Sequence, residues 1–243
     1  MKIYAETDIG MIRKINQDSY YISEESDNYK LCILADGMGG YTGGEIASRL
    51  ACVSTANYIK ENFEEDKKYT KEELMQLVKN AMNYANKNVY GKSKEQLELE
   101  QMGTTLEVCL IYNNRAFIGH IGDSRIYRIR QEFMKKITTD HSYVQKLVKD
   151  GTITKEEAIH HPKKNMLMKA LGCEEEIEPD ITVKGFNAGD VILICSDGLT
   201  NMIAEQEIYN IVKQNQENAV QNLVRKANEL GGYDNITVIL IAN

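Results

Sequence analysis

Apolar positions divide the chain of 243 residues into short runs typical of strands and longer stretches with the 3.6-residue period of helices. Runs rich in β-branched residues predict strands, and the turn dipeptide Asn113-Asn114 predicts a tight hairpin between two of them. The predicted strands span residues 2–8, 20–23, 30–35, 106–112, 116–121, 126–130, 133–137, 181–186, 191–195 and 236–242.

Four longer stretches have the helical period. In the first of them, one predicted apolar face carries Ile46, Leu50 and Val53, with Ala47 and Ala51 beside them. Before the second, Thr70 and Glu73 have the spacing of a capping box, which marks a helix start. The predicted helices span residues 42–63, a stretch that begins at Thr70, and residues 205–213 and 217–229.

The order of these elements is strands, two helices, strands, a polar insert over residues 140–172, strands, two helices and a last strand. This order lacks the βαβα alternation of a parallel doubly wound sheet. Clustered strands and paired helices favour an α+β fold, with stacked antiparallel sheets covered by helices. No repeat, linker or change of composition divides the chain, so a single domain over residues 1–243 is expected.

Composition excludes several classes of protein. With 29 Lys and Arg against 36 Asp and Glu, the formal net charge of −7 argues against a general nucleic-acid binder. No apolar run has the roughly 20 residues of a membrane-spanning helix. The first residues lack the apolar core of a signal peptide, so a cytoplasmic protein without membrane contact is expected. The five cysteines are scattered without a CxxC pair, which predicts reduced, buried thiols.

Four aspartates stand directly beside apolar strand-like runs: Asp36, Asp123, Asp197 and Asp234. A turn at a strand end explains any one of them. Four together would place mutually repelling carboxylates beside the core, which is costly unless cations balance them. Carboxylate oxygens and a backbone carbonyl, such as that of Gly37, suit the hard ions Mg²⁺ and Mn²⁺. No histidines have the spacing of a zinc site.

One spacing typical of a known class of phosphatase occurs in the sequence, but its surroundings argue against that function. Cys109 and Arg115 match the C-x₅-R spacing of cysteine-dependent phosphatases. That loop needs backbone N–H groups curled around phosphate and a thiol with a low pKa. Cys109 instead lies in an apolar run, and the residues between it and Arg115 include no glycine.

Nine short motifs occur in an order that resembles the bacterial branch of the metal-dependent Ser/Thr protein phosphatases, the PP2C family. The resemblance covers nearly the whole chain. It implies a four-layer αββα sandwich, in which helix pairs flank two antiparallel sheets and residues 140–172 form a flap beside the metal site. The motifs are Arg13-Lys14-Ile15-Asn16-Gln17-Asp18, Asp36-Gly37-Met38-Gly39-Gly40, Met102-Gly103-Thr104-Thr105, Gly122-Asp123-Ser124-Arg125, Asp140-His141-Ser142, His161-Pro162, Ala170-Leu171-Gly172, Ser196-Asp197-Gly198-Leu199 and Asp234-Asn235-Ile236-Thr237.

The resemblance also implies roles for single residues around two Mn²⁺ or Mg²⁺ ions, with a third ion in bacterial relatives. Asp36 would bridge the first two ions, and Asp197 and Asp234 would complete the first. The Gly37 carbonyl would bind the second ion.

Two further ligands and a substrate-binding residue follow from the same resemblance. Asp18 would hold the second ion through water, and Asp123 would hold the third ion together with Asp197. Arg13 would bind the substrate phosphate through its planar guanidinium. The metals would lower the pKa of a bridging water, which would attack phosphorus in line.

One departure concerns the leaving group. Animal and plant relatives have His where this chain has Met38, so an imidazole cannot act as the acid there. A metal-bound water or a histidine from elsewhere would have to take that role. His161 is one candidate, although a surface position before Pro162 explains it equally well. His120 is expected to be a core residue or a partner behind the site, and His141 to orient a turn.

The resemblance implies hydrolysis of phosphoserine and phosphothreonine monoesters on proteins by a monomer that opposes a bacterial Ser/Thr kinase. Two alternatives stay open. One is a phosphatase of the same fold that acts on an anti-sigma-factor antagonist. The other is a non-catalytic module that binds phosphoproteins.

Overall fold

Two antiparallel sheets form the centre of the protein in a computed structural model, which describes residues 1–24, 28–39, 43–95 and 99–243. The first sheet has the strand order β1-β11-β10-β7-β8. Its strands are β1 (Lys2–Asp8), β7 (Arg125–Arg130), β8 (Phe133–Lys136), β10 (Val191–Cys195) and β11 (Ile236–Ala242).

The second sheet has the strand order β2-β3-β5-β6-β9, and the short strand β4 extends it by pairing with the end of β3. Both Asn113 and Asn114 have positive φ angles in the tight turn between β5 and β6, as the sequence predicts. The strands are β2 (Asp18–Ile22), β3 (Lys30–Met38), β4 (Gly103–Thr104), β5 (Leu106–Tyr112), β6 (Arg115–Ile121) and β9 (Asp180–Gly185).

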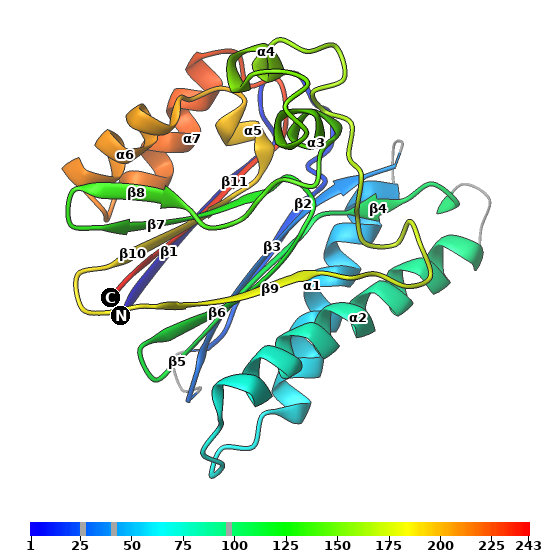
Figure 1. Ribbon diagram of the computed structural model, residues 1–243, viewed down its shortest axis with the longest axis vertical. Helices are drawn as coiled ribbons and strands as arrows, with labels where there is room; N and C mark the ends of the chain where they lie inside the picture. Colours follow the sequence, from blue (N-terminus) through cyan, green and yellow to red (C-terminus); the bar gives the residue numbers. More distant parts are fainter. Residues whose placement is uncertain (25–27, 40–42, 96–98) are drawn as a thin grey trace.

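Helices cover the outer face of each sheet, as Figure 1 shows. The pair α1 (Gly43–Asn62) and α2 (Lys71–Glu95) packs on the second sheet, and α6 (Glu205–Gln214) and α7 (Ala219–Glu229) pack on the first. The short helices α3 (Tyr143–Lys149), α4 (Lys155–Ile159) and α5 (Asp197–Thr200) lie together at one end of the sandwich. Among the described residues, no helix is both long and apolar enough to cross a membrane.

Three apolar clusters hold these four layers together. On β3, Ile33 packs toward α1 and α2, while its neighbour Leu34 packs between the sheets. On β10, Leu193 packs toward α6 and α7, while Ile194 faces the other sheet. Because both faces of these strands are covered, their sequences are continuously apolar rather than alternating. The predicted αββα sandwich is confirmed.

The predicted apolar face of α1 is wrong in part. Val53 is 49% exposed, and Ile46 and Leu50 are only partly buried. The small residues beside them, Ala47 and Ala51, are buried against β3 and α2 as predicted, so the contact is made by small side chains. Small side chains let the helix approach its neighbours closely, so the largest apolar residues lie at the margin of the contact. The predicted helix start at Thr42 and the motif residue Gly40 lie outside the described residues.

Two other expectations need correction. β3 does not end at Ala35 but continues through Asp36 to Met38, because β4 supplies hydrogen-bonding partners for this extension. All five cysteines are free, as expected, but Cys173 is exposed whereas the other four are buried. The predicted capping box at Thr70 is present, and a second one forms between Thr154 and Glu157 at the start of α4.

Candidate metal centre

Aspartates from separate strand ends meet at one cavity of about 560 Å³. Asp36 lies on β3, Asp123 follows β6, Asp197 follows β10 and Asp234 precedes β11. Every residue predicted for the site lines this cavity except Asp18. The remaining members are Arg13 and Gly37.

Asp18 lies behind the cavity wall, next to Asp36. The two residues are directly opposite each other in the β2–β3 pairing, so their side chains share one face of the sheet. Ser196 Oγ donates a hydrogen bond to Asp18 Oδ2 at 2.8 Å. Asp18 Oδ1 is buried and has no partner among the described residues. This position suits a carboxylate that acts on the cavity indirectly.

Two threonines hold the backbone of Asp36. Its N–H donates to Thr105 Oγ1 at 2.9 Å, and its carbonyl accepts from Thr105 N and Thr104 Oγ1, each at 2.9 Å. Gly37 follows in a space that excludes any side chain, since a Cβ there would lie 2.1 Å from Gly44 O and 2.6 Å from Gln17 O. The glycine is therefore required by close backbone contact.

Asn235 fixes the N-terminal loop that carries Arg13. Its Oδ1 accepts from Gln17 N at 2.8 Å, and its Nδ2 donates to the carbonyls of Ile9 and Ile15 at 2.9 and 3.0 Å. Arg13 Nη2 consequently reaches Asp234 Oδ2 at 2.7 Å, and the arginine side chain is 49% exposed. A cationic donor thus lies at the rim of the cavity, within reach of one of its aspartates.

Asp123 lies in a loop that His141 supports through Gly122. Gly122 N donates to His141 Nδ1 at 3.2 Å, and His141 N donates to Gly122 O at 2.7 Å. Because Nδ1 accepts a hydrogen bond, the ring proton is on Nε2, which faces Asp180 Oδ2 at 3.4 Å. Burial and the charge of His120 lower the pKa of His141, consistent with a neutral ring. The expectation that His141 orients a turn is confirmed.

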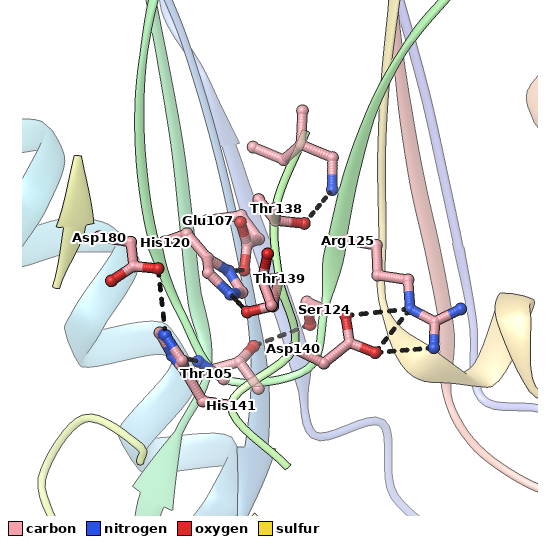
Figure 2. A network of polar contacts seen from close by, with 12 residues as sticks. Thr105, Glu107, His120, Ser124, Arg125, Thr138, Thr139, Asp140, His141 and Asp180 are labelled. Carbon is pink, nitrogen blue, oxygen red and sulfur yellow. Dashed lines mark hydrogen bonds and ion pairs between the residues drawn. The ribbon is translucent and has the colours of Figure 1, made fainter. Parts of the chain in front are cut away.

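His120 is a buried partner of Glu107, as Figure 2 shows. Its Nδ1 lies 2.6 Å from Glu107 Oε1, and its Nε2 donates to the Thr139 carbonyl at 2.9 Å. Burial by itself lowers the pKa of His120, but Glu107 outweighs this effect and the pKa rises to about 9. Burial raises the pKa of Glu107 to about 7. The expected supporting role of His120 is confirmed, while no sequence signal pointed to Glu107.

Asp140, at the start of the 140–172 segment, is neutralised by two cations. Arg125 Nη2 donates to its Oδ2 at 2.8 Å, and Lys136 Nζ donates to its Oδ1 at 3.1 Å. Burial would raise the pKa of Asp140, but these cations hold it below its usual value. Asp140 is thus a paired structural carboxylate, unlike the aspartates that line the cavity.

Apart from Asp234, which pairs with Arg13, the described carboxylates of the cavity form no ion pair. Burial, and then the charges of Asp18 and Asp197, raise the pKa of Asp36 far above its ordinary value. Burial also raises the pKa of Asp18 to about 7, and burial with the Asp197 charge raises that of Asp123 to about 8. Burial and Asp234 raise the pKa of Asp197. Carboxylates held together against their repulsion are a typical environment for divalent cations.

The donor set fits hard metal ions. It consists of carboxylates and carbonyls, with one buried carboxylate oxygen, Asp18 Oδ1, still unpartnered. Across the described ranges, no three His, Cys, Asp or Glu side chains are grouped closely enough to enclose an ion as they stand. Their present partners are protein groups: Arg13 binds Asp234, and Asn201 Nδ2 donates to Asp197 Oδ2 at 2.9 Å.

Two other sequence candidates lie away from the cavity. His161 is in a turn after α4, where its Nδ1 accepts from Lys163 N at 3.1 Å. Within the part of the chain that the structure describes, no histidine lines the cavity. Cys109 is buried inside β5, where burial raises the pKa of its thiol to about 12, so its rejection as a nucleophile is confirmed.

Comparison with known proteins identifies the family. The family model described as protein phosphatase 2C matches residues 13–231. The chain belongs to the protein phosphatase 2C family. The serine/threonine phosphatase stp of Listeria monocytogenes is 38% identical to it over 237 residues, covering 97% of this chain and 93% of the relative. Protein phosphatase PhpP of Streptococcus pneumoniae is 40% identical over 246 residues, covering 100% of this chain and 97% of the relative.

A solved structure of this family contains metal. The catalytic domain of the serine/threonine protein phosphatase PstP, in complex with two manganese ions, matches with a TM-score of 0.85 and 35% identity. The match covers 98% of this chain and 96% of that one. The bacterial PP2C resemblance of the sequence is therefore confirmed.

The residues that bond to the site aspartates and to the Arg13 loop from behind the cavity were not predicted from the sequence. Thr104, Thr105, Ser196 and Asn235 all stand within the family motifs, which was the available signal. Their roles follow only from the hydrogen bonds between strand ends.

Proposed function

We propose that the chain is a metal-dependent protein phosphatase that hydrolyses phosphoserine and phosphothreonine monoesters with two Mn²⁺ or Mg²⁺ ions. The observation that carries this proposal is the convergence of four aspartates on one cavity, with Arg13 paired to Asp234 at its rim. Such a cavity suits cations together with the dianionic phosphate of a protein side chain.

The aspartates divide the metal binding among them. Asp36, Asp197 and Asp234 would hold one ion, and Asp36 with the Gly37 carbonyl would hold the other. Asp18 would act from behind through water, consistent with its place outside the cavity wall. Asp123 with Asp197 would hold a third ion. When bound, the ions activate water as the nucleophile and offset charge on the phosphoryl oxygens.

Arg13 is proposed to bind the substrate phosphate. Once cations engage Asp234, its guanidinium is free to make two hydrogen bonds to phosphoryl oxygens. Asn235 holds the loop in place, so the position of Arg13 does not depend on its contact with Asp234.

Among the described residues that line the cavity, no histidine is placed to protonate the leaving serine or threonine. Met38 carries no titratable proton, and His161 belongs to a turn outside the described cavity lining. We propose that this proton comes from solvent in the cavity rather than from an imidazole.

Residues 140–172 are proposed to act as a flap within a single domain of residues 1–243. None of the described side chains of α3 and α4 is buried, whereas Asn165 and Leu167 of this segment line the cavity. The physiological partners would be phosphoproteins, including a Ser/Thr kinase, acted on by a monomer in the cytoplasm.

Hydrolysis of p-nitrophenyl phosphate tests the function. We expect turnover with Mn²⁺, loss of turnover with EDTA, and at least a hundredfold lower kcat, roughly, for Asp36→Asn and Asp197→Asn. Activity that survives both chelation and substitution would refute the metal mechanism. Absence of turnover by the intact protein with Mn²⁺ would favour a non-catalytic phosphoprotein-binding module.

A further inference from the structure

A second pocket of about 440 Å³ adjoins the candidate metal centre. Met38 and Leu167 line both cavities, so the two spaces share a wall. We call this second space the flap-side pocket. It is bounded by Met38, Ile121, residues 167–170 and residues 173–178 except Glu175. A chain bound with its phosphate at the aspartates could therefore extend into it.

The floor of the flap-side pocket is apolar. Ile121 and Ala170 are buried, and Ile177 is half-buried beside them. Met38 and Leu167 add flexible apolar contacts at the shared wall. Such a surface packs well against an aliphatic stem but offers little to a short polar side chain.

The rim of the pocket carries an excess of negative charge. Glu174, Glu176 and Glu178 line it, against a single lining cation, Lys169. Lys79 pairs with Glu178 at 2.8 Å. In the described structure, Glu174 and Glu176 take part in no ion pair, and both are exposed. Two carboxylates therefore remain available to a ligand above an apolar floor.

The acidic rim is held in place by a buried side chain. Asn86 of α2 is 1% exposed, and its Nδ2 donates to the carbonyls of Glu174 and Glu175, both at 3.0 Å. Its Oδ1 accepts from Gly172 N at 2.8 Å. These three bonds use the side chain to fix the backbone of the rim, so the carboxylates are presented from a preorganised segment.

We infer that the flap-side pocket is a substrate-specificity site that binds a Lys or Arg side chain near the phosphorylated residue of a protein substrate. The aliphatic stem lies on Ile121 and Ile177 while the cation meets Glu174 and Glu176. This inference rests on the proposed phosphatase function, because it concerns the segment that flanks the hydrolysed phosphate. The enzyme would then recognise the residue beside the phosphorylated one in the flap-side pocket, not at the metal centre.

Phosphopeptides that differ only by Arg or Gln test this inference. The substitution is scanned over about four residues on each side of the phosphothreonine, since an extended chain spans roughly 13 Å over that length. The test variant is Glu174→Gln/Glu176→Gln. The matched control is Glu65→Gln/Asp66→Asn, which removes the same charge from the exposed α1–α2 connection at the other end of the molecule (Figure 1).

We expect the wild type to prefer Arg at one or two scanned positions, measured as a ratio of kcat/KM values. That ratio should fall about three- to tenfold in the test variant and stay unchanged in the control, because exposed ion pairs contribute modestly. Turnover of p-nitrophenyl phosphate should be the same in all three proteins. The single reversal Glu176→Lys should shift the preference away from Arg.

An Arg preference that is unchanged in the test variant, or that falls equally in the control, would overturn the inference. So would a wild type without any Arg preference. Binding of the same peptides to Asp36→Asn protein, followed by fluorescence anisotropy, measures the pocket without hydrolysis. Failure of the phosphatase proposal, seen as absent p-nitrophenyl phosphate turnover, is thus separated from failure of the pocket proposal.

Discussion

Two stacked histidines, His120 and His141, differ in protonation state because their surroundings differ. The rings of His120 and His141 lie 4.6 Å apart. Glu107 holds the proton on His120, whereas burial and the Gly122 N–H favour neutral His141. Since His141 supports the Asp123 loop and His120 stacks on His141, the charge of each ring belongs to the structure of the site rather than to the reaction itself.

The Glu107–His120 pair predicts a dependence of stability on pH. The pKa of His120 is about 9 in the folded protein, against 6.5 for an unperturbed histidine such as that of an unfolded chain. A raised folded pKa gives stabilisation that is complete below pH 6.5 and is lost as the pH rises through 9. We expect the free energy of unfolding to fall over this window by roughly 1–3 kcal/mol, because one pKa unit corresponds to about 1.4 kcal/mol.

The variant Glu107→Gln isolates this effect. A neutral amide can donate to His120 Nδ1 while Nε2–H still bonds to Thr139, so His120 no longer needs its extra proton. Urea unfolding between pH 6.5 and 9 should show a flatter profile for this variant than for the wild type. The exposed change Glu95→Gln should keep the wild-type slope. Parallel profiles for Glu107→Gln and wild type would contradict the assignment.

At the scale of elements, pairing between strands sets the chemistry. The β2–β3 register puts Asp18 opposite Asp36, and a shift by one residue would turn one of them to the other face of the sheet. The β3–β4 pairing extends β3 far enough to bring Gly37 beside Gly44. Helix α1 contributes by its small residues, which allow that close approach.

Two substitutions test which face of α1 packs. Val53→Ala should change the free energy of unfolding by less than about 0.5 kcal/mol, because Val53 is half exposed. Ala51→Leu should cost about 1–3 kcal/mol, because Ala51 is fully buried against its neighbours. Urea denaturation measures both values. A larger loss for Val53→Ala than for Ala51→Leu would show that the large apolar residues of the helix, rather than its small ones, form the packed contact.

At the scale of the whole molecule, the two sheets together assemble the site. Asp18 and Asp36 come from one sheet, while Asp197 and Asp234 stand at strand ends of the other. Ser196 links the sheets by donating to Asp18 and accepting from Thr237 N at 2.9 Å. Packing of the sandwich thus forces carboxylates together, and their repulsion is a cost that bound cations would relieve.

Removal of one carboxylate should therefore stabilise the metal-free protein. We expect Asp36→Asn to raise the free energy of unfolding without metal by about 1–3 kcal/mol, since a buried charge is lost. Mn²⁺ should stabilise the wild type by about 2.7 kcal/mol at a concentration one hundred times Kd. This metal effect should be small or absent in Asp36→Asn.

Thermal unfolding with EDTA and with increasing Mn²⁺ measures both effects. The exposed double change Glu65→Gln/Asp66→Asn serves as the control and should behave like the wild type in each condition. Equal stabilisation of wild type and Asp36→Asn by Mn²⁺ would show that the ions bind elsewhere.

Much of the fold could be predicted because its signals are local. Strand runs, the Asn113-Asn114 turn and the capping boxes depend on residues that are neighbours in sequence, and the structure retains them. The exposed side of α1 and the extension of β3 were missed because each depends on a partner distant in the chain. Glu107 was missed for the same reason, since only the β5–β6 pairing sets it opposite His120.

The sequence by itself determined the elements, their order and the oxygen-rich aspartate set, because periodicity and residue chemistry need no partner. Tertiary structure alone decided that Asp18 lies behind the cavity, that Asn235 secures the Arg13 loop and that an acidic pocket adjoins the site. These outcomes depend on burial and hydrogen bonding between residues up to 226 positions apart, as for Asn235 and Ile9. Such contacts form only when the two sheets pack, so no local pattern encodes them.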